Sequence, residues 1–379
     1  MKKLFVIAVV TIASASAFAS KARLAALQSA AHVSDAQDVV GDNGGPIKPD
    51  QALGNGEWVS LEWGGNRGAT NAAVTKNAEG GFVRKMGDNA AMGAYLGNKS
   101  DSYSLFMALA AGTGAVAGTG TGTTALLNQS NPLNLYYAAK AGDMQWGLGL
   151  FYVSNDVKAS KMKENIMSLT ASATAAAGWD AQLTVGLGAE SKNEQTAGSE
   201  KVLKGGSSMA LSGGYKMDTM YVYGAYKTLA AKLTTGASTT NADWDINIMQ
   251  VGVVNSHKKD GADFFYGVSY NTDTRKEKQG NTKSEETTFP VIIGVEAEAT
   301  SWMVLRGSVT QNVLLGSTKA AGATDANTIA DNTTVAAGAG LKFGKFMLDG
   351  TFTNAASGTA TGLGTDANFV TNVGMTYNF

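Results

Sequence analysis

Side chains suited to nucleophilic, acid–base or metal chemistry are scarce in this sequence. The chain has no cysteine, which excludes thiolate chemistry, and its two histidines, His32 and His257, are too few for a multi-histidine metal site. A Ser-His-acid triad would have only these two residues as its base. His257 precedes Lys258 and Lys259 in a stretch expected to be a solvated turn. The sequence therefore predicts no enzyme activity, no cofactor and no metal site.

Two stretches expected to be loops, one rich in Gly and Thr and one rich in Lys, have residue types that occur in anion-binding sites. Gly112-Thr-Gly114 and Gly118-Thr-Gly120-Thr-Gly122 depart from the G-x-G-x-x-G pattern of a phosphate loop, and a flexible external loop accounts for them. Lys158, Lys161 and Lys163 are interleaved with acidic residues, which is typical of a solvated surface. Contact with lipopolysaccharide phosphates is the lesser alternative for these lysines.

The charge balance argues against nucleic acid as a partner. Of the 30 basic residues, Lys2 and Lys3 precede an apolar run that reads as a removable leader, and the other 28 face 31 acidic residues, a net charge of −3. Neither sign is gathered into a long block, so nucleic-acid binding is not expected. Without disulfides, an exported chain must gain its stability from burial and backbone pairing.

A set of charged residues would line one aqueous lumen if the chain forms strands with one face toward water. Each belongs to a segment in which apolar residues alternate with small, polar or charged ones, and each has the parity of the polar set. These candidate pore-lining residues are Glu62, Lys140, Asp180, Asp245, Glu296, Arg306, Lys342 and Asp349. Opposed charges would set a field across an aqueous pore and tune its ion preference. The alternative is that they lie at the rims or pair with each other and fill space.

The elements that would position these charges are about sixteen alternating segments. Each has about ten residues, the length that a tilted membrane strand needs. The segments are 57–64, 89–97, 102–111, 132–140, 144–153, 165–175, 179–189, 205–215, 219–229, 243–254, 263–272, 287–297, 301–311, 333–343, 346–354 and 368–379. The connections between them alternate between short and long, as in a barrel of up-and-down hairpins. We therefore predict an all-β fold, a transmembrane antiparallel up-and-down β-barrel.

The amino terminus divides into a leader and an extension. Lys2 and Lys3, an apolar run and the A-x-A site Ala17-Phe-Ala19 predict a signal peptide over residues 1–19. Residues 20–56 combine helical spacing with a Gly- and Pro-containing loop, which predicts a short helical extension, either a periplasmic tail or a plug in the lumen. The barrel itself is expected over residues 57–379.

The last strand carries the most specific motif. Val373, Met375, Tyr377 and Phe379 alternate with small or polar residues, so its two faces meet different surroundings. The residues Asn372, Gly374, Tyr377 and Phe379 together resemble the carboxy-terminal signal of outer-membrane barrels. That resemblance implies recognition by the barrel-assembly machinery and by periplasmic chaperones. In a barrel this strand must pair with residues 57–64, because no backbone edge is left bare in lipid.

Taken over nearly the whole mature chain, the pattern resembles a Gram-negative outer-membrane porin. The resemblance implies a water-filled channel for passive diffusion of small hydrophilic solutes and ions, surrounded by outer-membrane lipids, often as a homotrimer. An even number of strands implies that both termini are periplasmic. This sequence differs from the porin pattern in two places, and both concern the constriction of the pore. Residues 154–164 are short for the porin loop that folds into the lumen, and residues 20–56 precede the first strand. We expect residues 112–131, 154–164 or the extension to narrow the lumen.

Two other functions are left open by the sequence. One is a surface barrel with a closed lumen, whose Gly-, Thr- and Ala-rich loops act in adhesion or masking. The other is a channel for hydrophobic solutes with an amino-terminal hatch, suggested by Arg23-Leu-Ala-Ala-Leu27 before the first strand. This channel would need apolar residues in the lumen, where the alternation places mostly Gly, Thr, Asn and charged residues.

Overall fold

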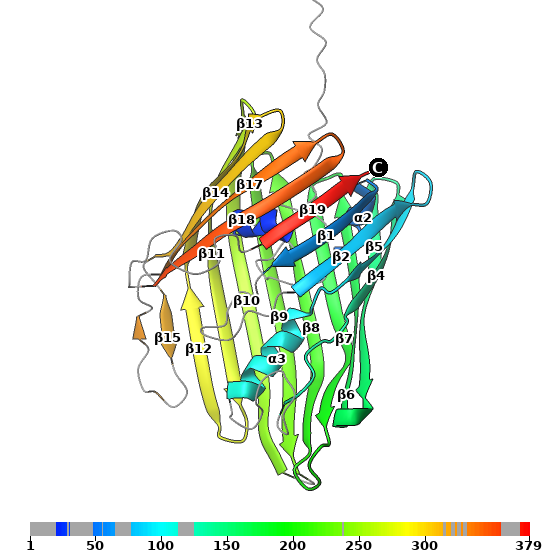
Figure 1. The fold of residues 1–379 in the computed structure, drawn as a ribbon. Coiled ribbons are helices and arrows are strands. Elements are labelled where there is room, and N and C mark those ends of the chain that lie inside the picture. The colour runs from blue at the N-terminus through cyan, green and yellow to red at the C-terminus, as the bar shows by residue number, and fades with distance from the viewer. Residues whose placement is uncertain are drawn as a thin grey trace, which may run out of the picture.

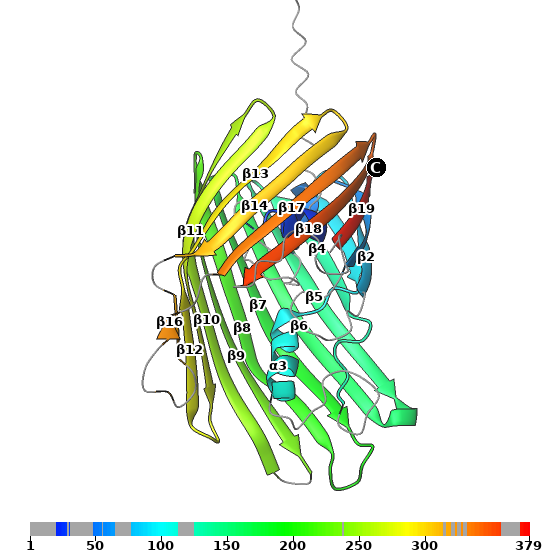
Figure 2. The same ribbon diagram turned by 60° about the vertical axis from the view of Figure 1, so that its left-hand side comes forward.

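The chain folds into a closed 16-strand antiparallel β-barrel with helices in its interior (Figures 1 and 2). This computed structural model describes residues 20–28, 30, 48–54, 56–64, 77–112, 125–236, 239–313, 316–319, 323, 327–328, 332–357 and 372–379. The predicted fold class is confirmed. The predicted signal peptide, residues 1–19, lies outside the described residues.

Strands supply most of the described elements. They are β1 (Trp58–Gly64), β2 (Asn77–Lys85), β3 (Ala90–Leu96), β4 (Leu133–Ala141), β5 (Met144–Val157), β6 (Met162–Ala175), β7 (Trp179–Asn193), β8 (Lys201–Met217), β9 (Met220–Thr235), β10 (Thr239–Lys259), β11 (Ala262–Glu277), β12 (Thr282–Thr288), β13 (Pro290–Thr300), β14 (Met303–Asn312), β15 (Ser317–Lys319), β16 (Asn327–Thr328), β17 (Asn332–Phe343), β18 (Phe346–Ser357) and β19 (Asn372–Asn378). The helices are α1 (Lys21–Ala26), α2 (Gln51–Gly54), α3 (Asp101–Gly112) and the 3-10 turn η1 (Lys158–Ser160).

The wall has fewer strands than this numbering because three short strands do not add to it. β12 and β13 are one wall strand interrupted at Phe289, since both pair with β11. β15 and β16 form a small hairpin, and β15 pairs with β12. β14 pairs directly with β17, so the hairpin does not separate these two wall strands.

The wall closes where the last strand meets the first. β19 pairs antiparallel with β1 from Trp58 opposite Asn378 to Gly64 opposite Asn372. Beyond the strand, the Phe379 N–H donates to the Glu57 carbonyl at 3.1 Å. This confirms the predicted seam, and it leaves no open edge between β1 and β19.

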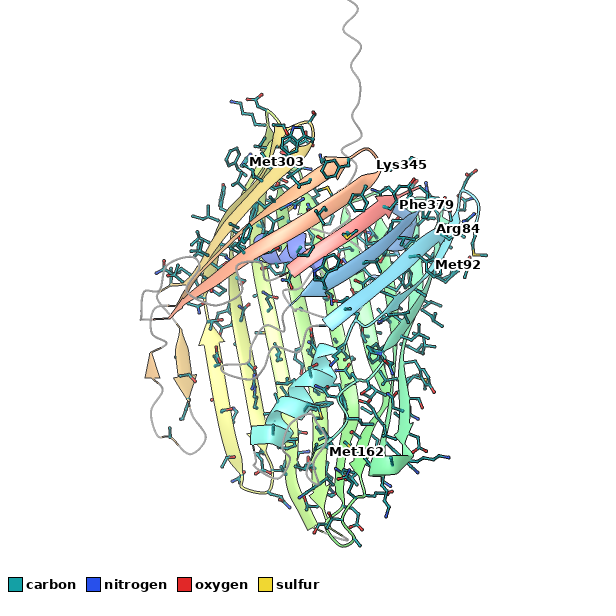
Figure 3. All side chains as sticks on the ribbon, in the orientation of Figure 1. Arg84, Met92, Met162, Met303, Lys345 and Phe379 are labelled. Atoms are coloured by element: carbon teal, nitrogen blue, oxygen red, sulfur yellow. The ribbon has the colours of Figure 1, made fainter. Side chains whose placement is uncertain are left out.

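The two ends of the barrel differ in their connections. At one end, the short-turn rim, the strands are joined by residues 86–89, 142–143, 176–178, 218–219, 260–261, 301–302 and 344–345. The other end, the long-loop rim, includes the connection 97–132 and the long strands, of which β10 has 21 residues. Figure 3 shows Phe379 and Lys345 at the short-turn rim and Met162 toward the long-loop rim.

The outer face of the wall is apolar. Leu148, Leu169, Leu211, Val251 and Ile293 come from five different strands and are 47–62% exposed. Such a surface would be unfavourable in water, whereas hydrocarbon accommodates it. The barrel therefore has the architecture of an outer-membrane protein. Among the described residues, no helix is both long and apolar enough to cross a membrane.

One predicted strand is wrong and one strand was missed. Residues 102–111 form most of helix α3 instead of a strand. Its buried residues Tyr103, Phe106, Met107 and Ala110 recur at the spacing of a helix face, and the stretch is rich in Ala, Leu and Met, which favour helix. The missed strand is β2, whose Gly80 and Gly81 lower the strand propensity. The two errors cancel, so the count of sixteen survives.

Two expected connections are shorter than predicted. β5 and β6 extend through most of residues 154–164, so this stretch is a hairpin and not a loop that folds inward. β10 continues to Lys259, which puts His257 in a strand opposite Phe264 instead of in a turn. Its ring stacks on Tyr266 with the ring centroids 6.4 Å apart.

Deleting Phe379 should reduce the yield of assembled barrel roughly tenfold, because the seam loses a backbone hydrogen bond and an interfacial ring, together about 1–2 kcal/mol. The measurement is the heat-modifiable mobility of the membrane fraction. Phe343→Ala is the matched control, since Phe343 is equally exposed near the same rim but lies outside the seam. Equal loss of assembly in both variants would contradict a special role for the seam.

Candidate functional site

The lumen near the short-turn rim is occupied by the segment that begins at Ser20. Helix α1 contacts β14, β17, β18 and β19, and its residues Ala22, Leu24 and Ala26 are buried (Figure 2). Ser20 caps the helix by accepting a hydrogen bond from the Arg23 N–H at 3.0 Å. Its small residues allow close contact with the wall: a Cβ added at Gly338 would lie only 2.7 Å from that of Ala26.

A network of charges, which we call the latch cluster, fastens α1 to the wall. It consists of Ser20, Arg23, Glu296, Arg306 and Asp349. The Arg23 guanidinium donates to both carboxylate oxygens of Glu296, at 2.9 and 2.8 Å. The fully buried Arg306 side chain bridges Glu296 at 2.7 Å and Asp349 at 2.5 Å, and the Ser20 hydroxyl donates to Asp349 at 2.8 Å. Such a buried network is stable only while each charge keeps its partner.

Lys21 attaches the same segment to the opposite side of the seam. Its backbone N–H donates to Glu62 of β1 at 2.8 Å, and its ammonium contacts Glu79 of β2 at 2.6 Å and Asn98 at 2.9 Å. Glu62 is buried by this contact. Gly374 of β19 faces Ser20 so closely that an added Cβ would collide with it. This residue of the predicted assembly signal therefore also seats the segment.

Residues 48–54 form a second contact with the wall inside the lumen. The buried Lys48 ammonium pairs with Asp180 of β7 at 2.9 Å, and Asp180 also accepts from the Tyr221 hydroxyl at 2.7 Å. Asp50 accepts from the Thr174 hydroxyl at 2.6 Å. Helix α2 places its apolar side chains in a cluster with Trp58, Val83, Tyr95 and Tyr136. The extension is therefore seated on several strands around the barrel.

The structure brings together most of the predicted pore-lining charges, but it pairs them with the extension. The residues engaged in this way are Glu62, Asp180, Glu296 and Asp349, and Arg306 bridges Glu296 and Asp349 within the wall. The remaining three lie apart. Lys140 and Lys342 are near the short-turn rim, where Lys342 pairs with Glu298 at 2.6 Å.

Asp245 is on the other face of its strand, which corrects the prediction for this residue. Its neighbours Trp244 and Ile246 are the buried, inward-facing residues of β10. Asp245 pairs with Lys278 at 2.8 Å near the long-loop rim. The prediction failed because the inward-facing residues of this strand are apolar: Trp244 and Ile246 belong to the apolar cluster inside the barrel.

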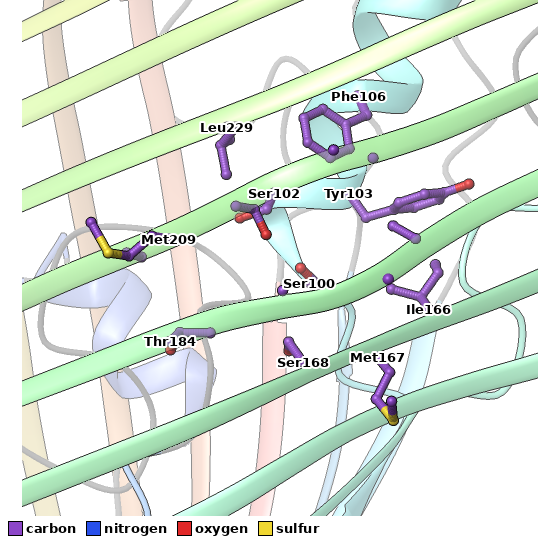
Figure 4. Close-up of a pocket in the computed structure, with 17 residues that line it drawn as sticks. Ser100, Ser102, Tyr103, Phe106, Ile166, Met167, Ser168, Thr184, Met209 and Leu229 are labelled. Carbon is purple, nitrogen blue, oxygen red and sulfur yellow. The ribbon is translucent and has the colours of Figure 1, made fainter.

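The other half of the lumen contains the described parts of the connection between β3 and β4, residues 97–112 and 125–132, which we call the lumen insert. Its helix α3 packs on the inner face of β8 and β9 (Figures 1 and 2). Tyr103 and Phe106 (Figure 4) meet Leu203, Leu229 and Ile246 in one apolar cluster. The expectation that the lumen wall has mostly Gly, Thr, Asn and charged residues is wrong here.

Polar contacts hold the ends of the lumen insert. The buried carboxylate of Glu164 in β6 accepts from the backbone N–H groups of Gln129 and Ser130 and from the Asn155 amide. Burial lowers the pKa of the Lys99 ammonium, and the nearby Glu164 carboxylate opposes this shift. Burial also raises the pKa of the Tyr103 phenol, which therefore stays neutral. The described parts of the insert are thus held against the inside of the wall, whereas most of the Gly- and Thr-rich stretch predicted to be an external loop, residues 113–124, lies outside the described residues.

The described residues contain no cluster of metal-ligating side chains. No group of three or more His, Cys, Asp or Glu side chains within them is placed to hold a metal ion. The residues that sequence reasoning missed are those of the lumen insert. The recurrence of Tyr103, Phe106, Met107 and Ala110 is the signal that could have identified them.

Replacing Arg23 by Gln should loosen the segment, because two charge-assisted hydrogen bonds of about 1.5–3 kcal/mol each are lost. In a Leu24→Cys background, which adds the only thiol of the chain, a water-soluble maleimide should then react at least ~10-fold faster. Lys342→Gln is the matched control, since its half-exposed pair is worth about 0–1 kcal/mol. Equal labelling rates for the Leu24→Cys chain with and without Arg23→Gln are the result that would refute the latch.

Comparisons with known proteins find outer-membrane proteins of low sequence identity and low TM-score. No protein-family model and no curated protein matches the chain. Outer-membrane expressed OmpT of Vibrio cholerae is 12% identical over 84% of this chain and 94% of its own, with a TM-score of 0.36. A porin refined at 1.8 Å resolution is 11% identical over 85% and 99%, with a TM-score of 0.38. A Pseudomonas aeruginosa FadL homologue is 10% identical over 87% and 91%, also with a TM-score of 0.38. Such likenesses carry no argument about function, so the assignment as an outer-membrane barrel rests on the closed wall and its apolar outer face.

Proposed function

We propose that this chain is an outer-membrane channel for small apolar or amphipathic solutes, held closed at rest by its own N-terminal segment. The observation that carries the proposal is the apolar cluster inside the barrel, where Tyr103 and Phe106 face Leu203, Leu229 and Ile246. Apolar surface in a water-filled pore is unfavourable, whereas it stabilises a bound apolar solute. This cluster supports the proposal, because a channel for hydrophobic solutes needs apolar side chains inside the barrel.

In this proposal residues 20–56 act as a hatch and residues 57–379 as the barrel that it closes. The segment is joined to the wall by apolar side chains such as Leu24 and Leu27 and by charged groups, among them Arg23, Lys21 and Lys48. Water can replace the charged contacts more readily than it can replace a packed apolar core. The hatch is therefore built to leave its seat without unfolding the barrel.

The two rims indicate how the barrel is oriented in the membrane. We place the short-turn rim, with both termini, in the periplasm and the long-loop rim outside, since membrane barrels have short periplasmic turns and longer external loops. A solute would then meet the lumen insert first and the hatch second. The predicted signal peptide is the expected means of export.

Passive diffusion of small hydrophilic solutes and ions is a second candidate, favoured by the polar half of the lumen. Once the segment withdraws, the wall near the short-turn rim would present Glu62, Asp180, Glu296, Arg306 and Asp349 to water. A mixed-sign wall of this kind would admit polar solutes and tune ion preference. In this alternative the chain is a porin whose constriction is formed by its own extension.

Several expectations about partners stay predictions. They are the homotrimer, the recognition of the last strand by the barrel-assembly machinery and periplasmic chaperones, and contact with lipopolysaccharide. The adhesion or masking role, with a permanently closed lumen, is an outcome of the experiment that follows. The expectation that the chain is not an enzyme also stays a prediction.

The two channel functions differ in the solute that crosses. In intact cells with a lipopolysaccharide outer leaflet, expression of the chain should speed uptake of the neutral fluorophore N-phenyl-1-naphthylamine, whereas arabinose should swell proteoliposomes only slowly. Arg23→Gln should raise fluorophore uptake roughly tenfold, because about 1.5–3 kcal/mol per charge-assisted bond no longer holds the hatch. Lys342→Gln should behave as the wild type.

Fast arabinose swelling with no gain in fluorophore uptake would replace the proposal by the hydrophilic channel. If neither solute crosses, with or without Arg23→Gln, the closed surface barrel is the better account. Heat-modifiable mobility shows in each case that the variant barrel is assembled.

A further inference from the structure

The seam between β1 and β19 joins the two ends of the wall through short strands. β1 and β19 have seven residues each, whereas β10 has 21. The residues that pair at the seam are far apart in sequence, for example Ser60 opposite Thr376. Bringing such distant strands together costs chain entropy before their hydrogen bonds form. The seam is therefore the ladder of the wall that is hardest to start.

The inner face of the wall carries a row of carboxylates across this seam. Glu79 of β2 lies directly opposite Glu62 of β1. Gly374 of β19 lies opposite Glu62 on one side and opposite Asp349 of β18 on the other. Glu62 and Asp349 are buried, and the Glu79 side chain is 7% exposed. We call Glu79, Glu62 and Asp349 the acid row. Like charges directly opposite each other destabilise a ladder, so the acid row opposes the pairing of its own strands.

Two successive residues of the N-terminal segment bind the acid row on both sides of the seam. The Lys21 ammonium contacts Glu79 at 2.6 Å, and the Lys21 backbone N–H donates to Glu62 at 2.8 Å. The Ser20 hydroxyl donates to Asp349 at 2.8 Å. The segment thus brings a positive charge to the opposed carboxylates of β1 and β2 while it is bonded to β18.

The rest of the segment follows the strands that precede the seam, where α1 is the blue helix behind β18 in Figure 1. Thr351 of β18 donates to the Ala22 carbonyl, and Ser308 of β14 donates to the Ala26 carbonyl at 2.7 Å. Residues 20–28 therefore contact six neighbouring wall strands, β14, β17, β18, β19, β1 and β2. The seam lies within this set.

We propose that residues 20–28 are a clasp that assembles the seam: they bind β17–β19 and β1–β2 before these strands pair with each other. Strands held on one clasp meet at a high effective concentration, and Lys21 offsets the repulsion within the acid row. Once formed, the seam is held by its own backbone hydrogen bonds, so the segment can still leave its seat as a hatch. This role in assembly does not depend on which solute the channel passes.

The clasp differs from a segment that docks in a finished barrel in the rate that it changes. Contacts that form before the seam speed its closure, whereas contacts that form afterwards only slow its opening. The two rates therefore have to be measured separately.

A pair of cysteines at the seam reports closure. Ser60 and Thr376 lie directly opposite each other with buried side chains. Opposed Cα atoms of an antiparallel ladder are about 4.5–5.5 Å apart, within the range of about 4.4–6.8 Å that a disulfide spans. The chain has no other cysteine, so the double variant Ser60→Cys, Thr376→Cys can form only this bond within one chain. Diamide added at successive times during refolding from urea into detergent micelles should trap the seam as it closes.

In this background Lys21→Gln should slow trapping at the seam at least ~10-fold, because the charge-assisted bond to Glu79 is lost and the acid row repels itself. Adding Glu79→Gln should restore most of the rate, since it removes one of the two opposed carboxylates. Lys48→Gln is the matched control, because Lys48 belongs to the same extension and its buried ion pair is with Asp180 of β7, away from the seam. It should leave the rate at the seam unchanged.

A second pair of cysteines separates closure of the seam from folding in general. Ser212 and Ala225 lie opposite each other in the hairpin of β8 and β9, whose strands are joined by a short turn. The double variant Ser212→Cys, Ala225→Cys should be trapped at the same rate with and without Lys21→Gln. Loss of heat-modifiable mobility of the reduced barrel in urea measures opening.

Slower or absent trapping at the seam alone, restored by Glu79→Gln, supports the clasp. An unchanged rate at the seam overturns it, and so does an equal slowing at both cysteine pairs or a loss that Glu79→Gln does not restore. Unchanged closure together with faster opening also overturns it, because the segment then docks only after the seam has formed.

Discussion

Closure of the β-sheet is the constraint on which the rest of the structure depends. Backbone groups facing hydrocarbon have no water to bond, so every wall strand needs two partners, and β19 supplies the last of them to β1. A closed wall of sixteen strands encloses more volume than its own inward side chains can fill. The contents of the lumen therefore decide what the barrel does.

The chain fills its lumen with two segments of opposite character. Near the short-turn rim, α1 and residues 48–54 bind the wall through buried charges such as Arg306 and Lys48. Toward the long-loop rim, α3 packs apolar side chains on β8 and β9. A polar seat favours reversible docking, because water can replace its bonds, whereas an apolar cluster favours solutes of its own kind.

The sequence predicted the wall far better than its contents. Alternation and the carboxy-terminal motif sufficed for the strand class, the seam and the inward parity of Glu296, Arg306 and Asp349, because a two-residue period is a local signal. The same two-residue period led to a wrong prediction for α3, because Ser and Tyr residues alternate at the start of this helix. Its helical spacing becomes visible only over two turns. The partners of Arg23 and Ser20 lie 273 and 329 residues away, and no local pattern encodes contacts of that range.

The central claim is that the N-terminal segment occludes a lumen that the wall alone would leave open. Planar-bilayer recording of the purified barrel with and without residues 20–54 tests it most directly. The account predicts little conductance from the full chain and a steady conductance, proportional to salt concentration, from the shortened one. A full chain that conducts like an open barrel, with no change when the segment is removed, would contradict it.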